Sequence, residues 1–298
     1  MKLIRAEHLG MCFGVRDAIA LATAQSAHQP LTILGDLVHN ETVLQELRAR
    51  GIQLEQNLEE VNTPAVMITA HGASNRTLNA VRQRGHAVFE ATCPLVHVAH
   101  RAVTRLVQDG YHPVIIGKRD HVEVRGLTGD LDSFDVVLTE ADVWELEPRA
   151  KFGIAAQTTQ PIERVRHLVA LIRQRFPNAD VKFVDTVCQP TKQRQMAAVQ
   201  LAQQCDIVIV IGGAHSNNTH ELVATCRKHC DRVYHVQAAS DLAPEWFRET
   251  DTVGITAGTS TPDSVIDAIE KWIREAVSGD DALERRMSAA SATGVVTG

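Results

Sequence analysis

Three of the six cysteines stand where a strand pattern gives way to a helix pattern. Cys12, Cys93 and Cys188 each follow a short apolar run and precede an amphipathic segment. A helix N-terminus stabilises a thiolate, which is the form of cysteine that ligates metals. Three such thiolates, brought together from distant parts of the chain, would suit an iron–sulfur cluster with one iron left open to a substrate. Buried reduced cysteines that pack as small apolar side chains are the alternative, and the absence of a Cys-x-x-Cys spacing leaves it open.

The other three cysteines lie within apolar segments. Cys205 precedes a strand pattern at Asp206–Ile211, and Cys226 and Cys230 are one helical turn apart in a helix pattern at Glu221–Cys230. A metal site with a neighbouring histidine would lack a fourth ligand at a zinc-like spacing. We therefore expect these three cysteines to contribute to packing.

The composition of the chain argues against two classes of binding partner, nucleic acids and membranes. The chain has 298 residues, with 30 Lys and Arg against 36 Asp and Glu, and aromatic residues make up only 4%. A net charge of −6 and few aromatic side chains argue against a nucleic-acid-binding surface. The first residues lack the apolar core of a signal peptide, and no run approaches the length of about 20 apolar residues that spans a membrane. We expect a cytoplasmic protein with reduced thiols, which binds neither nucleic acid nor a membrane.

The pattern of elements predicts an α/β fold. Short β-branched runs alternate with amphipathic segments, and strands that are apolar on both faces are typical of parallel sheets covered by helices. The strands are expected at Lys2–Ala6, Leu31–Leu34, Ala65–Ala70, Ala87–Ala91, Pro113–Gly117, Val136–Thr139, Phe152–Ala156, Val181–Asp185, Asp206–Ile211, Arg232–Val236 and Thr252–Ala257. The helices expected between them include Asp17–Ala27, Thr42–Arg50, Val96–Gln108, Ile162–Arg175, Gln193–Gln204 and Asp263–Ala276.

The three strand-end cysteines also divide the chain. Their long intervals each suit a small α/β unit with several strands. We interpret residues 1–92, 93–187 and 188–277 as three such units, which contain Cys12, Cys93 and Cys188 respectively. Residues 278–298 are polar and small, so we expect a mobile tail.

Polar side chains collect in the turns that follow the strands, where parallel α/β sheets bind their ligands. His39, His71 and His121 occupy three of these turns, and hydroxyl and amide side chains fill others. Together with helix N-termini they would suit a small, multiply charged anion. Glu123 follows His121 by two residues and is our candidate proton donor, although a glutamate that only favours a helix N-terminus fits the spacing equally well.

These residues resemble the 4-hydroxy-3-methylbut-2-enyl diphosphate reductase family over about residues 1–275. The resemblance rests on the order and spacing of several motifs: Gly-Met-Cys12-Phe-Gly-Val, Val-His39-Asn, Ala-His71-Gly, Ala-Thr-Cys93-Pro-Leu-Val, His121-x-Glu123, Gln-Thr158-Thr, Asp-Thr-Val-Cys188 with Arg194-Gln195, Ser216-Asn-Asn218 and Thr-Ala-Gly-Thr-Ser260-Thr-Pro-Asp. It implies three similar α/β domains, arranged with pseudo-threefold symmetry around a central 4Fe–4S cluster.

The resemblance also implies a role for each motif. Cys12, Cys93 and Cys188 would ligate three irons, which leaves the apical iron open to the substrate hydroxyl. Glu123 would supply the proton, with Thr158 orienting the substrate hydroxyl and His121 beside it. The diphosphate would lie against His39, His71, His121, Ser216, Asn217, Asn218 and Ser260, and Thr158 would bind the substrate at its hydroxyl end.

The implied reaction is a two-electron reductive dehydroxylation that gives isopentenyl and dimethylallyl diphosphate, with a ferredoxin or flavodoxin as electron donor. The chain departs from the family pattern at Val122, where the family usually has proline, and at Ala214 and Asn217 in the phosphate loop. A glutamine and a proline also follow Cys188 where the family has other residues. Two alternatives remain: a diverged paralogue with hydro-lyase-like chemistry, and a non-catalytic iron–sulfur redox or binding protein.

Overall fold

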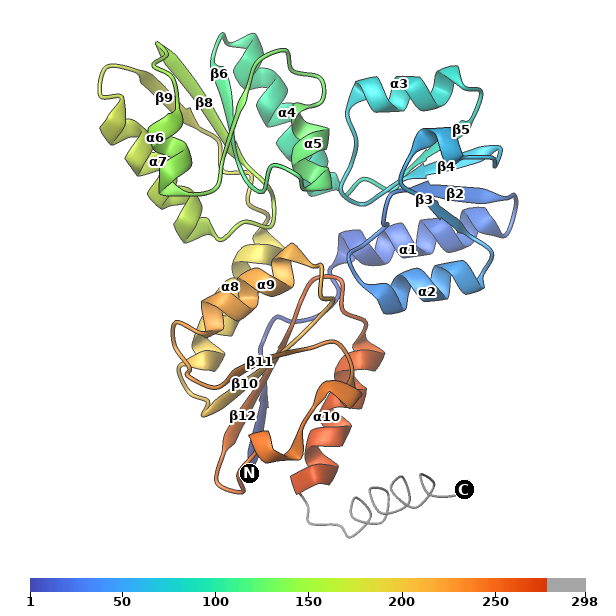
Figure 1. Cartoon of the computed structure of the whole chain (residues 1–298), viewed down its shortest axis with the longest axis vertical. Coiled ribbons are helices and arrows are strands. Elements are labelled where there is room, and N and C mark those ends of the chain that lie inside the picture. Colours follow the sequence, from blue (N-terminus) through green and yellow to red (C-terminus); the bar gives the residue numbers. More distant parts are fainter. Residues whose placement is uncertain (278–298) are drawn as a thin grey trace, which may run out of the picture.

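The computed structural model describes residues 1–277, which form three parallel four-stranded sheets flanked by helices. Figure 1 shows three lobes around a common centre, with one sheet in each lobe. The strands are β1 (Lys2–Arg5), β2 (Leu31–Leu34), β3 (Gln53–Glu55), β4 (Ala65–Ile68), β5 (Ala87–Glu90), β6 (His112–Ile116), β7 (Asp135–Val137), β8 (Lys151–Ala156), β9 (Asp180–Phe183), β10 (Ile207–Ile211), β11 (Val233–Val236) and β12 (Thr252–Ala257). The predicted α/β class and the three similar domains are confirmed.

Helices connect the strands along the whole described chain. They are α1 (Phe13–Ser26), α2 (Glu41–Ala49), α3 (Asn75–Gln83), α4 (Pro94–Gln108), α5 (Val122–Thr128), α6 (Glu140–Glu145), α7 (Ile162–Arg175), α8 (Gln189–Ala202), α9 (Asn217–Cys226) and α10 (Asp263–Val277), with 3-10 turns at Leu58–Glu60, Ala239–Asp241 and Pro244–Trp246. No helix in this part of the chain is both long and apolar enough to cross a membrane.

The order of the strands shows a connection that the sequence did not predict. The sheets have the orders β3-β2-β4-β5, β7-β6-β8-β9 and β1-β12-β10-β11, so β1 pairs with β12 in the third sheet. A division at residues 1–92 therefore does not hold for β1, which contributes its hydrogen bonds to the last unit. Because the chain leaves the third sheet through Cys12 and enters the first unit as α1, Cys12 lies at the junction of these two units.

Three helices begin earlier than their apolar periodicity predicts. The structure starts α1 at Phe13, α4 at Pro94 and α8 at Gln189, and a cysteine occupies each N-cap position. The first turns carry Gly, Pro and polar residues, which conceal the helix period. The short polar strand β3 was missed for a similar reason, since it lacks an apolar run. The expected tail at residues 278–298 lies outside the described residues.

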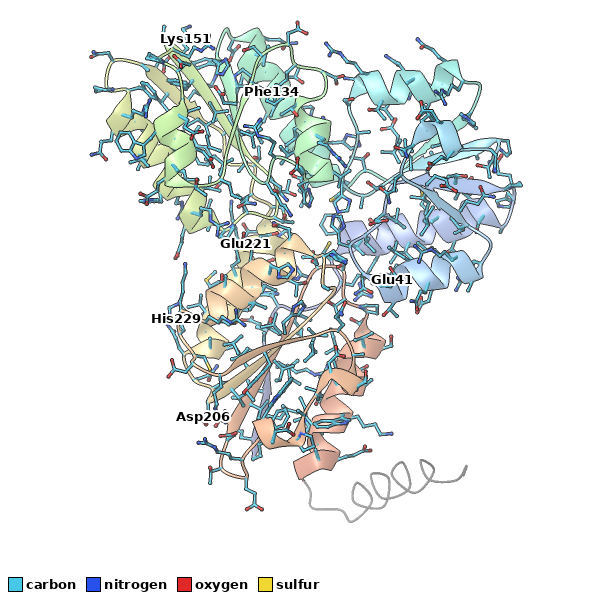
Figure 2. The ribbon with its side chains drawn as sticks, in the orientation of Figure 1. Glu41, Phe134, Lys151, Asp206, Glu221 and His229 are labelled. Carbon is cyan, nitrogen blue, oxygen red and sulfur yellow. The ribbon has the colours of Figure 1, made fainter. Side chains whose placement is uncertain are left out.

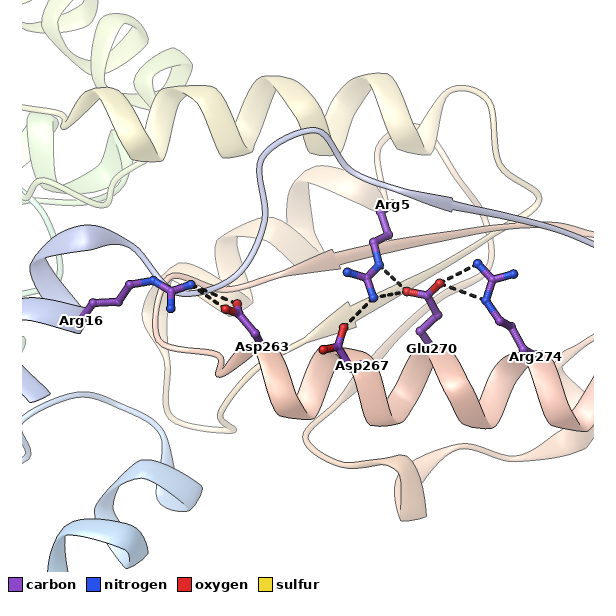
Figure 3. A network of polar contacts seen from close by, with 6 residues as sticks. All are labelled: Arg5, Arg16, Asp263, Asp267, Glu270 and Arg274. Atoms are coloured by element: carbon purple, nitrogen blue, oxygen red, sulfur yellow. Dashed lines mark hydrogen bonds and ion pairs between the residues drawn. The ribbon is translucent and has the colours of Figure 1, made fainter.

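Ion pairs and helix-end contacts join the units close to their common centre. Arg164 on α7 pairs with Glu221 on α9 at 2.6 Å, and Figure 2 shows Glu221 at the end of the third lobe that faces the second. Arg16 on α1 pairs with Asp263 at the start of α10 at 2.9 Å (Figure 3). Asp130 of the second unit accepts backbone N–H bonds at the start of α3. These contacts fix the separation of the turns that carry the candidate site.

Candidate active site at the junction of the three units

Each predicted ligand cysteine is the N-cap residue of a helix. Cys12 precedes α1, Cys93 precedes α4 and Cys188 precedes α8, and none of their side chains caps its own helix. All six cysteines of the chain are free thiols. Cys188 Sγ lies 3.0 Å from the Thr191 hydroxyl, and the three cysteines stand at the starts of three helices.

The surroundings of these thiols show that they lie close to one another. Cys93 packs against the first turn of α1, because a Cβ built on Gly14 would lie only 2.6 Å from Cys93 Sγ. Burial is the main cause that raises the pKa values of Cys93 and Cys188. The negative charges of Cys12 and Glu123 raise them further, to a lesser extent, so both groups lie near these thiols. At Cys93 and Cys188 burial thus outweighs the effect of the helix N-terminus, and a bound metal would have to displace the protons of these two thiols.

Glu123 is a buried carboxyl that is held by one residue of the second unit. Only 1% of Glu123 is exposed, and Thr158 donates its backbone N–H to Oε1 at 2.6 Å and its hydroxyl to Oε2 at 2.9 Å. Burial raises the pKa of Glu123 to about 7, although both Thr158 bonds favour the charged form. A carboxyl with this pKa holds a proton for a large part of the time at neutral pH, as a general acid must.

The three predicted histidines form one cluster. Their ring centroids lie 4.6 Å apart for His39 and His71, 5.3 Å for His39 and His121, and 5.5 Å for His71 and His121. Burial lowers the pKa of all three, to about 3 for His121, so the rings are neutral without a ligand. The Glu123 backbone N–H donates to His121 Nδ1 at 3.1 Å, which leaves Nε2 as the proton-bearing donor of that ring.

Two amide side chains beside the histidines have donors without partners. Among the described residues, Asn217 Nδ2 and Asn218 Nδ2 are buried and make no hydrogen bond. A buried donor without an acceptor costs free energy, so both nitrogens are arranged for a ligand that supplies acceptors. Ser216 caps α9 by accepting the Thr219 N–H at 3.3 Å, as expected for a Ser or Asn cap in this loop.

A cavity of about 600 Å³ opens beside these donors. Its lining residues include His39, Lys118, His121, His215 and Asn217. Ser260 also lies at this edge, since its hydroxyl donates to the His39 carbonyl at 3.3 Å. The structure therefore brings together the predicted binding residues from all three units.

The chemistry of this cavity favours an anion. The three imidazoles alone could ligate a cation, since their ligand atoms lie within 4.8 Å of one another. However, Lys118 and Asn217 line the same cavity and offer N–H donors, which oppose a metal ion and favour phosphate oxygens. Sequence reasoning missed Lys118. Its position in the turn after β6, two residues beyond the strand end and three before His121, was the available signal.

The remaining three cysteines pack in the third unit, as expected. Cys226 and Cys230 are buried in the core beneath β10, with Cys205 packed against it. Burial raises the pKa of Cys226 to about 12 and that of Cys205 to about 11, so both thiols are inert. One detail was wrong: α9 ends at Cys226, and Cys230 lies beyond the helix.

Comparisons with known proteins identify the family of the chain. The family model of the LytB protein matches residues 3–274. The 4-hydroxy-3-methylbut-2-enyl diphosphate reductase of Aquifex aeolicus is 36% identical, over 93% of this chain and 97% of the relative. The protein of that name from Trichlorobacter lovleyi is 35% identical, over 90% of this chain and 96% of the relative.

Solved structures extend the likeness to three dimensions. A structure of (E)-4-hydroxy-3-methyl-but-2-enyl diphosphate reductase, the terminal enzyme of the non-mevalonate pathway, is 36% identical with a TM-score of 0.67, and the alignment covers 92% of this chain and all of that one. The corresponding reductase from Plasmodium falciparum, at 24% identity, shares the fold with a TM-score of 0.84 over 92% of this chain and 87% of that one. On the extent of the family match and the identity to these relatives, the chain belongs to the LytB family.

Proposed function

We propose that this chain reduces 4-hydroxy-3-methylbut-2-enyl diphosphate, with loss of its hydroxyl group, to isopentenyl and dimethylallyl diphosphate. The observation that carries the proposal is the meeting of three N-cap cysteines with a buried, protonatable Glu123 beside a histidine-lined cavity. Its relatives bear the name of this reductase, and they align with more than nine-tenths of the chain.

The three cysteines fit an iron–sulfur cofactor. A 4Fe–4S cluster with Cys12, Cys93 and Cys188 as ligands would have one iron without a protein thiolate. Soft sulfur donors select iron–sulfur clusters, and here they are free thiols contributed at the starts of three different helices. When bound, this cluster would supply electrons one at a time and a Lewis-acidic iron for the substrate hydroxyl.

The polar residues of the junction bind the diphosphate. Nε2 of His121 and the unpaired amide nitrogens of Asn217 and Asn218 donate hydrogen bonds to phosphate oxygens, and Lys118 adds a positive charge. His39, His71, Ser216 and Ser260 complete the set of donors. The whole chain carries a charge of −6 and therefore has no overall positive charge to attract the diphosphate. These local donors bind it instead.

Glu123 delivers the proton that the departing hydroxyl needs. Thr158 holds both carboxyl oxygens by its backbone N–H and its hydroxyl, and this hydroxyl would relay the proton to the substrate hydroxyl. The reaction consumes two electrons and two protons: the C–O bond breaks, one proton leaves with the hydroxyl as water, and the other forms a new C–H bond at either end of the allyl unit. A pKa of about 7 keeps the acid form available at neutral pH and depletes it as the pH rises further.

The departures from the family pattern leave this machinery intact. Asn217 still offers an amide donor in place of a hydroxyl, and Val122 opens α5 directly after the His121 cap, with Glu123 in the first turn of that helix. No observation on the described residues favours the hydro-lyase or the non-catalytic alternative. The electron donor we propose is a one-electron carrier such as a ferredoxin or flavodoxin, in the cytoplasm.

A turnover assay separates these functions. The protein, purified without oxygen, is supplied with the hydroxylated allylic diphosphate and a low-potential reductant. We expect both isomeric products, and only when the reductant is present. Product formation without a reductant would support a hydro-lyase, and an intact cluster without any turnover would support a non-catalytic protein.

A further inference from the structure

Arg194 is a buried arginine at the centre of the molecule, and none of its hydrogen bonds goes to a carboxylate of the described residues. It lies on α8, which begins directly after Cys188, and only 8% of it is exposed. Its Nε and Nη2 donate to the Gly10 carbonyl oxygen at 3.1 and 2.8 Å, and Nη1 donates to the Pro190 carbonyl at 3.1 Å. All of these acceptors are neutral backbone oxygens.

The position of Arg194 links two of the ligand cysteines. Gly10 has a φ of +73° and lies two residues before Cys12, so the guanidinium holds the loop that delivers Cys12 to the centre. Arg194 itself belongs to α8, the helix that begins directly after Cys188. One arginine thus ties the first ligand loop to the third ligand helix.

The charge of Arg194 needs an anion that the neutral polypeptide around it does not provide. Burial lowers the pKa of Arg194, and the groups that favour its charged form are Cys12 and Cys188 in their thiolate state. A buried cation without a counter-ion is strongly destabilising. Other arginines contrast with it: Arg16, on α1, is half exposed and paired with Asp263.

We propose that Arg194 is the counter-ion of the thiolate-ligated cluster and that its charge raises the cluster's reduction potential. This inference rests on the proposed function. Three thiolates around a 4Fe–4S core give a net negative group, which becomes more negative when it accepts an electron. A fixed positive charge beside it stabilises the reduced state more than the oxidised state, since hydrogen bonds and charge around a cluster set its potential.

Redox titration of the anaerobically loaded protein, followed by electron paramagnetic resonance, tests the role of the charge. Arg194→Gln removes the charge and keeps an amide donor for Gly10, whereas Arg194→Lys keeps the charge and loses the planar fork. We expect Arg194→Gln to reduce the equilibrium constant for one-electron reduction about tenfold, a shift of about 59 mV to more negative potential. We expect Arg194→Lys to stay close to the wild type. The control Arg48→Gln, which removes an exposed arginine paired with Glu41 on α2, should leave the potential unchanged.

Thermal unfolding with and without the cluster provides a second readout. Without iron, Arg194→Gln should be at least as stable as the wild type, because it removes an unpaired buried charge. With the cluster, the gain in melting temperature should be smaller than in the wild type. If only the bonds to Gly10 matter, the iron-free variant will lose stability instead.

The outcomes separate this inference from the proposed function. A wild-type protein that binds iron, combined with an unchanged potential in Arg194→Gln, or equal shifts in the Gln and Lys variants, would overturn the counter-ion role. A wild-type protein that binds no iron would overturn the proposed function. In that case, a lower melting temperature of Arg194→Gln than of the iron-free wild type would show independently that Arg194 only stabilises the fold through its bonds to Gly10.

Discussion

The six cysteines form two sets of three in opposite surroundings. Cys12, Cys93 and Cys188 stand at helix N-termini where three units meet, among groups whose pKa values are shifted and donors that lack partners. The second set lies in the third unit alone, where apolar side chains surround buried Cys226 and Cys230. Both sets are at least partly shielded from water. Convergence with polar groups from other units, rather than burial, distinguishes the three proposed ligand cysteines from the three cysteines of the apolar core.

The largest expected effect comes from removing one cysteine of each set. Cys188→Ala should lose the cluster and abolish turnover, because a thiolate ligand of the metal is missing. Cys226→Ala, the matched control, should bind iron normally and cost only the packing of a small side chain. Iron content and visible absorbance of both variants check this contrast. Equal iron in the two variants would remove the distinction between the sets.

Glu123→Gln tests whether the centre also contains the proton donor. The amide keeps the shape of the side chain but carries no acidic proton, so we expect turnover to fall by about 10²–10⁴-fold while the cluster spectrum stays unchanged. The wild type should lose turnover as the pH rises above about 7, the pKa of this carboxyl. Glu270→Gln on α10, an ion-paired carboxylate outside the site (Figure 3), should retain full turnover. Unchanged kinetics in Glu123→Gln would exclude its catalytic role.

Asn218→Ala tests the unpaired donors at the centre. Loss of one hydrogen bond to a charged phosphate should raise KM about 10–100-fold with a smaller change in kcat. The iron-free protein should keep its stability, because Nδ2 has no partner to lose among the described residues. Asn57→Ala, which removes an exposed amide that bonds to Glu60, is the control. A KM equal to that of the wild type would show that Asn218 does not contact the substrate.

The smallest expected effect is the pH dependence of stability that Glu123 causes. The ordinary pKa of a glutamate is 4.5 and burial raises that of Glu123 to about 7, so the folded state binds the proton more tightly than the unfolded chain. This contribution is complete below about pH 4.5 and is lost as the pH rises to about 7, on the order of 3 kcal/mol. The histidines have lowered pKa values and act in the opposite direction, so the wild type must be compared with Glu123→Gln. If the free energies of unfolding of the wild type and Glu123→Gln differed by the same amount at all pH values, the raised pKa of Glu123 would be contradicted.

Much of the site was predictable because parallel α/β sheets place their ligands at strand ends. This rule led to His39, His71 and His121 in three separate turns, and the structure brings them into contact. The same rule selected Cys12 and Cys188 over cysteines in apolar runs. The local sequence pattern was sufficient to predict those site residues whose role depends on their position at the end of a strand.

Other features depend on contacts that no local pattern contains. The pairing of β1 with β12 joins the two ends of the described chain, and the polar β3 has no apolar signal. The raised pKa of Glu123 comes from its complete burial in the folded chain. The unpaired charge of Arg194 likewise follows only from its neighbours in space, although the residue belongs to a motif that the sequence analysis noted.

The measurement that tests the central claim most directly is the iron and sulfide content of the wild-type protein, purified and reconstituted without oxygen. If three thiols hold a cubane cluster at the junction, about four irons and four sulfides should bind per chain, with a brown colour. A folded protein that remains colourless and free of iron after reconstitution would contradict the account.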